Sequence, residues 1–391
     1  MSVAGSTIYL DYQATTPTDA RVVEAMLPFL NEQFGNPHST SHAFGWEAKD
    51  AVEAAREELA NLIGAEPREV VFTSGATESN NLAIKGVGRF YRERRPHIVT
   101  LVTEHKCVLE SVRRLEREGN RVTILGVGAD GLVDLDELAA AIDDETALVS
   151  IMTVNNEIGV IQPMAEIGAL CRSRGAFLHT DAAQAAGKVP LDVNAMNIDL
   201  LSISGHKMYG PMGIGALYVR RRPRVRLEPL FDGGGQERGI RSGTLPAPLC
   251  VGLGTAARLA ADELASEAER LGALRGRFLN AIRARVPDMR LNGSAEKRIP
   301  GNLNLSFPGT DSEQLMAALG GVAVSSGSAC TSAEVEPSYV LRALGVEDDL
   351  ARASLRIGLG RQTTEDEVDR AVDQIADEIE RQRSPDAQSV A

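Results

Sequence analysis

Residues 176–207 read AFLHTDAAQAAGKVPLDVNAMNIDLLSISGHK and contain two short apolar runs that each lead into polar residues. The first run ends at Asp181, and Lys207 follows the second. Further short apolar runs occur before and after this stretch, and helical patterns separate several of them. This alternation predicts an α/β fold whose mostly parallel sheet is flanked by helices on both faces. Ligands of such sheets bind beyond the carboxyl ends of the strands, where Asp181 and Lys207 are expected.

The sequence also predicts two domains. A long helical pattern that begins near Leu249 is long enough to link two lobes, and fewer strand patterns follow it. We expect residues 17–260 to form a large cofactor-binding domain. Residues 1–16 and 261–391 would form a smaller α/β domain, which carries a mobile cysteine loop at about 324–336.

Composition narrows the class of protein. The 391 residues have a formal net charge of -13, which argues against a nucleic-acid-binding surface. The N-terminal residues lack the pattern of a signal peptide, and no apolar run approaches the ~20 residues of a membrane helix. None of the four cysteines forms a C-x-x-C pair. We therefore expect a cytoplasmic enzyme with reduced thiols, no structural zinc site and no membrane contact.

Two residues could support chemistry on an aldehyde cofactor. A desolvated lysine beyond a strand end, such as Lys207, can form a Schiff base, although most lone lysines are solvated loop residues. Asp181 could keep a pyridine nitrogen protonated, or it could cap a helix.

Two further segments follow strand patterns. The stretch TSGATE (73–78) precedes a helical pattern, so its backbone N–H groups could cradle a phosphate. A capping box based on Ser74 or Thr77 is the alternative. His105 could stack on a planar cofactor and move protons, or it could be a structural residue.

Cys330 lies in SSGSACTS (325–332), whose small residues have little bulk with which to bury a thiol. An accessible thiol in a flexible loop suits a nucleophile. Cys171 and Cys250 lie in apolar helical patterns and are expected to be buried and inert. Cys107 is also expected to be structural, although it lies close to His105.

Ten motifs together resemble the cysteine desulfurases of the IscS/NifS-type group. They are LDYQATTP (10–17), FGNPHS (34–39), FTSGATESNNLA (72–83), TEHK (103–106), NNEIG (155–159), HTDAAQ (179–184), SGHKMYGP (204–211), GGGQERGIRSGT (233–244), SSGSACTS (325–332) and EPSYVLRALG (336–345). The resemblance extends from about Ile8 to Arg381. It implies the aspartate-aminotransferase-type fold, pyridoxal 5'-phosphate as cofactor and a homodimer with active sites at the subunit interface.

The resemblance also implies a role for each site residue. Lys207 forms the Schiff base with the cofactor and moves the α-proton of the substrate. Asp181 pairs with the pyridine nitrogen, His105 stacks on the ring, and Gln184 contacts the ring hydroxyl. The phosphate is held by Ala76, Thr77, Ser204, His206 and, from the partner subunit, Thr244. The substrate is bound by Asn36, Asn156 and Arg356, and Asn156 also lies beside the cofactor ring.

In this family the substrate L-cysteine gives L-alanine, and the resemblance implies that Cys330 receives the sulfur as a persulfide. An iron–sulfur scaffold protein is the expected acceptor, and other thio-cofactor routes stay open. Cys330 would also serve as a transient Fe–S ligand shared with the scaffold. Only DAQSVA follows Pro385, so scaffold docking is expected to be weaker or to use other surfaces.

Three alternatives stay open at this point. An aminotransferase would not need the Cys330 loop. A selenocysteine lyase would use the same residues. A scaffold or regulatory subunit that keeps the fold would not need Lys207.

Overall fold

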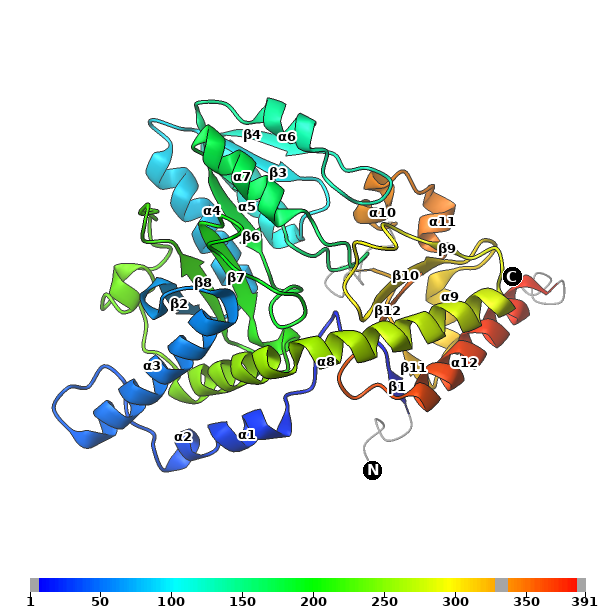
Figure 1. The fold of residues 1–391 in the computed structure, drawn as a ribbon, viewed down its shortest axis with the longest axis horizontal. Helices are drawn as coiled ribbons and strands as arrows, with labels where there is room; N and C mark the ends of the chain where they lie inside the picture. The colour runs from blue at the N-terminus through cyan, green and yellow to red at the C-terminus, as the bar shows by residue number, and fades with distance from the viewer. Residues whose placement is uncertain (1–6, 328–336, 385–391) are drawn as a thin grey trace.

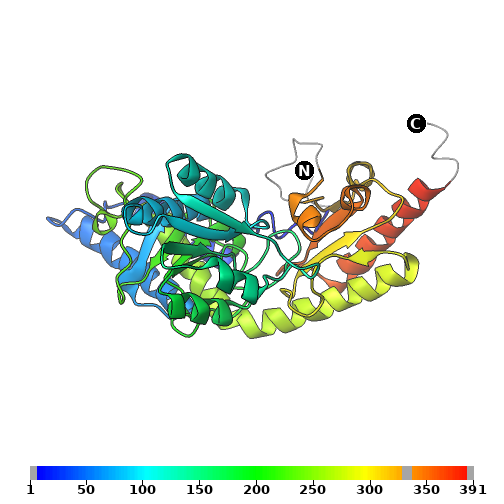
Figure 2. The same cartoon turned by 90° about the horizontal axis from the view of Figure 1, so that it is seen from above.

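The computed structural model describes residues 7–327 and 337–384, so Cys330 lies outside the described residues. Two lobes lie side by side, and one long helix runs beneath both of them (Figures 1 and 2). This helix, α8, spans Ala247–Arg285. The expectation of a long linking helix is confirmed.

The larger lobe is built on a seven-stranded sheet with the order β2-β8-β7-β6-β5-β3-β4. Its strands are β2 (Val70–Thr73), β3 (His97–Leu101), β4 (Arg121–Leu125), β5 (Thr146–Ser150), β6 (Phe177–Asp181), β7 (Leu200–Ser204) and β8 (Gly215–Val219). Strand β8 runs antiparallel to both of its neighbours, and the other pairs are parallel. The mostly parallel sheet predicted from the apolar runs is therefore confirmed.

Helices cover both faces of this sheet because its strands are apolar on both sides. Alternate residues of one strand enter different cores: Val70 and Phe72 pack with one set of helices, and Val71 packs with the other. The first set includes α3 (Ala43–Ile63), α7 (Met164–Arg174) and the first half of α8. The second set comprises α4 (Ala76–Tyr91) and α5 (Lys106–Arg117). The remaining helices of this lobe are α1 (Ala20–Met26), α2 (Pro28–Asn31) and α6 (Leu135–Ala141).

The smaller lobe has its own apolar core. Ile8 and Leu10 pack there with residues from Leu271 to Ile379, including the second half of α8. Its elements are β1 (Ile8–Tyr9), β9 (Arg290–Leu291), β10 (Asn302–Ser306), α9 (Ser312–Ala318), β11 (Val322–Ala323), α10 (Tyr339–Ala343), α11 (Asp348–Arg352), β12 (Ser354–Gly358) and α12 (Glu365–Arg383). Ile8 and Leu10 thus place the N-terminal residues on the small lobe. A further cluster joins the lobes, because Ile158 and Val160 pack with Val340 and Leu341 of α10. The division near residues 17 and 260 stays a proposal.

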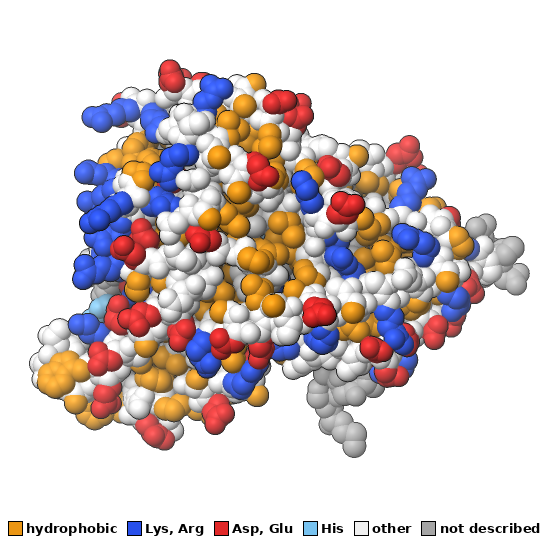
Figure 3. Space-filling model, viewed as in Figure 1, with side chains coloured by type: hydrophobic (Ala, Val, Ile, Leu, Met, Phe, Trp, Pro, Cys, Tyr) orange, Lys and Arg blue, Asp and Glu red, His pale blue; other side chains and the backbone are white. Residues whose placement is uncertain are grey.

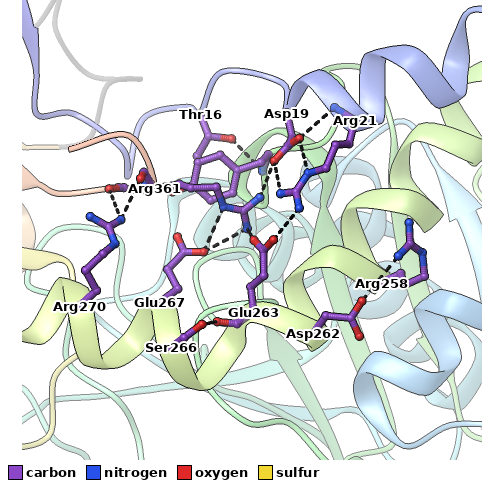
Figure 4. Close-up of polar contacts among 12 residues, drawn as sticks. Thr16, Asp19, Arg21, Arg258, Asp262, Glu263, Ser266, Glu267, Arg270 and Arg361 are labelled. Atoms are coloured by element: carbon purple, nitrogen blue, oxygen red, sulfur yellow. Dashed lines mark hydrogen bonds and ion pairs between the residues drawn. The ribbon is translucent and has the colours of Figure 1, made fainter. Parts of the chain in front are cut away.

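A network of charged side chains joins the two lobes (Figure 4). Arg361, which follows β12, bonds to Asp19 ahead of α1 and to Glu267 in α8. Its guanidinium carbon lies 4.2 Å from the centre of the Tyr209 ring, and its backbone N–H donates to the Tyr209 hydroxyl at 2.6 Å. Because Tyr209 lies two residues after Lys207, this network ties the small lobe to the segment that carries the predicted cofactor lysine.

Candidate active site

A cavity of about 360 Å³ lies where the ends of several strands meet. Asp181 closes β6, Lys207 lies in the 3-10 turn after β7, and His105 follows β3. Most of the predicted site residues line this cavity: Ala76, Thr77, His105, Asn156, Asp181, Gln184, Ser204, His206, Lys207 and Arg356. The parallel sheet therefore brings together residues that are far apart in the sequence.

One end of the cavity suits a phosphate group. The N-cap of α4 is Gly75, whose φ of 147° is a conformation that L side chains rarely adopt, and no side chain caps this helix. The predicted capping box at Ser74 or Thr77 is therefore wrong. Instead, the Ser74 backbone N–H donates to Glu78 at 2.8 Å. An uncapped 16-residue helix presents backbone N–H groups and the positive end of its dipole to the cavity.

The carboxylate of Asp181 is held in a fixed orientation. Its Oδ2 accepts from Asn80 Nδ2 at 2.6 Å, and its Oδ1 accepts from the Ala183 backbone N–H at 2.9 Å. The segment after Asp181 forms turns rather than a helix, so the helix-cap alternative is wrong for this aspartate. A buried, oriented carboxylate in the cavity suits a protonated pyridine nitrogen.

His105 is the N-cap of α5. Its Nδ1 accepts from the Cys107 backbone N–H at 3.2 Å and lies 3.0 Å from Cys107 Sγ. Asn80 Nδ2 also donates to this sulfur at 3.2 Å. Asn80 thus links Asp181 to the His105 pair. Cys107 was expected to be structural, yet its thiol contacts a predicted site residue and lines the cavity.

Lys207 and Gln184 share a contact on the N-terminal segment. The Lys207 ammonium donates to the backbone carbonyls of Gln13 and Ala14, and Gln184 Nε2 donates to the Gln13 carbonyl at 2.8 Å. Lys188 donates to Gln184 Oε1 at 3.0 Å. Burial and the nearby charge of Lys207 lower the pKa of Lys188 to about 7. These contacts fix the Gln184 amide at the cavity wall.

Two more titratable groups border the site. Burial, together with the charge of Lys207, lowers the pKa of His206 to about 4. Burial raises the pKa of the Glu104 carboxyl well above its usual value, although its Oε1 accepts from the Met152 backbone N–H at 2.7 Å. His206 is therefore neutral at pH 7, and Glu104 resists ionisation.

Arg356 in β12 marks the small-lobe side of the cavity. Its side chain is only 1% exposed, and its guanidinium donates to Asp11 at 2.8 Å and to the Asn156 carbonyl at 3.0 Å. Arg356 Nε and Asn156 Oδ1 are buried without a hydrogen-bond partner among the described residues. Such groups suit the carboxylate and the amine of an amino-acid substrate.

Three predicted residues are not brought to this cavity. Asn36 and Thr244 are exposed and are absent from its lining, and Cys330 lies outside the described residues. The prediction from sequence also missed Asn80, Asp11 and Gln13. Cys171 and Cys250 are buried, as expected, and burial raises the pKa of each thiol to about 12.

A second cavity, of about 530 Å³, contains none of the predicted residues. Arginines dominate its wall: Arg68, Arg220, Arg221, Arg222, Arg224, Arg226 and Arg238. The positive charge of this cavity is local, since the chain as a whole is acidic. The cavity has neither a lysine nor a carboxylate at the end of a strand to hold the cofactor.

Comparison with known proteins identifies the family of the chain. Residues 8–371 match the class-V aminotransferase family. The cysteine desulfurase IscS of Rickettsia bellii (strain OSU 85-389) is 60% identical over 96% of this chain and 92% of its own length. The chain belongs to the cysteine desulfurases of the class-V aminotransferase family. The mitochondrial cysteine desulfurase of Drosophila melanogaster is 62% identical over 97% of this desulfurase and 82% of its own length.

Solved structures agree with this assignment. A NifS-like protein superposes with a TM-score of 0.89 at 36% identity, covering 96% of the desulfurase and 99% of the other chain. SspA in complex with cysteine gives a TM-score of 0.81 at 40% identity, covering 90% and 99% of the two chains. The expected fold class, the desulfurase activity and the dependence on pyridoxal phosphate are confirmed.

Within the residues that the structure describes, no helix is long and apolar enough to cross a membrane. The same ranges hold no group of three or more His, Cys, Asp or Glu side chains that could bind a metal ion.

Proposed function

We propose that this desulfurase converts L-cysteine to L-alanine with Lys207 as the cofactor lysine and Cys330 as the sulfur acceptor. The observation that supports the assignment of Lys207 is its place in one cavity with an uncapped helix N-terminus, the buried Asp181 carboxylate and Arg356. The first feature fits the phosphate of pyridoxal phosphate, and Asp181 fits its ring nitrogen. Lys207 fits its aldehyde.

Each end of the substrate has a proposed partner. Arg356 binds the carboxylate, because bonds from its terminal nitrogens to Asp11 and the Asn156 carbonyl hold the guanidinium in place and its Nε has no partner among the described residues. Lys207 removes the α-proton, since its amine lies at the same cavity. When bound, pyridoxal phosphate acts as an electron sink for the charge that develops at the α-carbon.

Sulfur transfer is assigned to Cys330. Its thiolate forms an S–S bond with the substrate sulfur while the substrate C–S bond breaks. The bonding pair stays with the β-carbon, which takes up a proton and becomes the methyl group of alanine. Lys207 returns a proton to the α-carbon. The persulfide on Cys330 is then passed to an acceptor protein, for which we propose an iron–sulfur scaffold.

We also propose that two copies of the chain pair to complete the site. Large apolar side chains are exposed on and between α2 and α3, among them Leu30 (61%), Phe34 (65%) and Trp46 (53%). Figure 3 shows hydrophobic side chains gathered at this end of the molecule. Exposed apolar surface of this kind is typical of an interface. In such a dimer, the exposed Thr244 of one copy would contact the cofactor phosphate in the site of the other copy.

The test of the proposed function is Cys330→Ala. This variant should bind pyridoxal phosphate like the wild type but release almost no sulfide from cysteine. Cys171→Ala is the matched control, because it removes a buried thiol that does not line the cavity, and it should retain turnover. Wild-type sulfide release by Cys330→Ala would refute the assigned acceptor.

A further inference from the structure

Glu78 places a carboxylate at the phosphate end of the active-site cavity. It lies in the first turn of α4 and lines the cavity together with Ser74 and Gly75. Its Oε2 accepts the Ser74 backbone N–H at 2.8 Å, so Glu78 helps to hold the loop between β2 and α4. A negative charge at this point repels the phosphate group that the helix N-terminus attracts. The same side chain therefore supports the loop but would weaken phosphate binding if its charge were not compensated.

Arg241 is the cation that compensates this charge. Its Nε donates to Glu78 Oε1 at 2.8 Å, and a terminal nitrogen donates to Oε2 at 3.3 Å. The side chains of Arg241 and Glu78 are only 19% and 9% exposed, so little water screens the pair. Burial opposes ionisation of Glu78, but the bonds from Arg241 and Ser74 keep the pKa of its carboxyl below the usual value. Glu78 is therefore ionised at neutral pH.

Arg241 acts from outside the cavity, because its side chain is not part of the lining. The other carboxylate that acts on Arg241 is that of Glu237, which accepts two bonds of 2.8 Å from Arg56. Thr244 follows Arg241 by three residues on the same segment. Replacement of Arg241 could therefore act through the charge of Glu78 or through the position of Thr244, and the test has to separate these two effects.

We propose that Arg241 is a positioning residue whose main effect is electrostatic: it cancels the charge of Glu78 so that the cavity accepts a phosphate-bearing cofactor. The ion pair lets Glu78 keep its bond to the Ser74 backbone without a loss of affinity for phosphate. This inference rests on the proposed function for the identity of the ligand, but it is measured as binding, without turnover.

The test is a fluorescence titration of the cofactor-free enzyme with pyridoxal 5'-phosphate and, separately, with pyridoxal, which lacks the phosphate. Arg241→Gln leaves the Glu78 charge uncompensated in a poorly screened site, so it should weaken binding of pyridoxal 5'-phosphate by about tenfold or more. Binding of pyridoxal should stay close to the wild-type value. An equal loss for both ligands would overturn the proposal, because it would indicate general damage to the site.

Replacement of Glu78 separates the charge from the position of Thr244. The double variant Glu78→Gln/Arg241→Gln has no uncompensated carboxylate, so its affinity for pyridoxal 5'-phosphate should return close to that of the wild type. A double variant as weak as Arg241→Gln would show that Arg241 acts through the Thr244 segment, and it would overturn the proposal.

Glu78→Gln alone keeps the proposal testable if Arg241→Gln does not fold. The glutamine oxygen can still accept from Ser74, and the charge of Arg241 remains. This variant should bind pyridoxal 5'-phosphate at least as tightly as the wild type, and weaker binding would overturn the proposal. Failure of the wild type to bind pyridoxal 5'-phosphate would instead count against the proposed function.

Discussion

Replacement of Arg361 by alanine should destabilise the junction between the two lobes by about 3 kcal/mol. The guanidinium lies over Tyr209, and such a cation–π contact contributes about 1 kcal/mol when partly desolvated. A hydrogen bond to a charged group contributes about 1.5–3 kcal/mol. Glu267 would lose such a bond, whereas Asp19 would keep Arg21. The two losses together amount to about 2.5–4 kcal/mol. Because 19% of the Arg361 side chain is exposed, we expect a value of about 3 kcal/mol, below the upper end.

The assay is urea unfolding of the cofactor-bound enzyme at equal protein concentration. Arg277→Ala is the matched control, because Arg277 also forms ion pairs between α8 and another segment but is exposed, and its loss should cost much less. Arg361→Lys should recover only part of the loss, since an ammonium group cannot reproduce the planar fork. A loss for Arg361→Ala no larger than that for Arg277→Ala would refute the reasoning.

Three further outcomes are expected. Glu237→Ala should cost about 3–5 kcal/mol in urea unfolding, because it removes the buried carboxylate of the Arg56 ion pair and leaves Arg56 only the exposed Glu53. Glu104→Gln should gain stability over wild type as pH rises above about 4.5, because the folded state of the wild type binds more protons than the unfolded state there; a pH-independent difference would contradict this. Gly215→Ala should weaken pyridoxal-phosphate binding in a fluorescence titration, because its Cβ would lie 2.6 Å from the Gly75 Cα atom at the phosphate loop. Unchanged affinity would show that the loop can move.

The sequence predicts this architecture well because the strands are short apolar runs, and polar site residues follow several of them. Asp181 and Lys207 can be placed at one edge of the sheet by topology alone. The links between strands could not be predicted in this way. Asn80 and Asp181 are separated by 101 residues, and nothing in either segment specifies that their side chains meet.

The usual preferences for helix N-cap residues also gave wrong predictions at the two helices that border the cofactor site. Ser74 and Thr77 are good capping residues, yet the cap position belongs to Gly75 because its backbone conformation excludes ordinary side chains. Conversely, histidine is not a common N-cap, so no local pattern predicts that His105 takes this role at α5.

The number of residues in helix α8 sets how the two lobes are placed relative to each other. Its 39 residues extend for about 58 Å and contribute to both cores without interruption. One inserted residue near its middle would turn everything beyond it by about 100° and shift it by about 1.5 Å. Arg356, on the small-lobe side of the active-site cavity, would then lose its alignment with Lys207 on the large-lobe side, although neither residue had changed. We therefore expect this helix to tolerate substitutions far better than insertions or deletions.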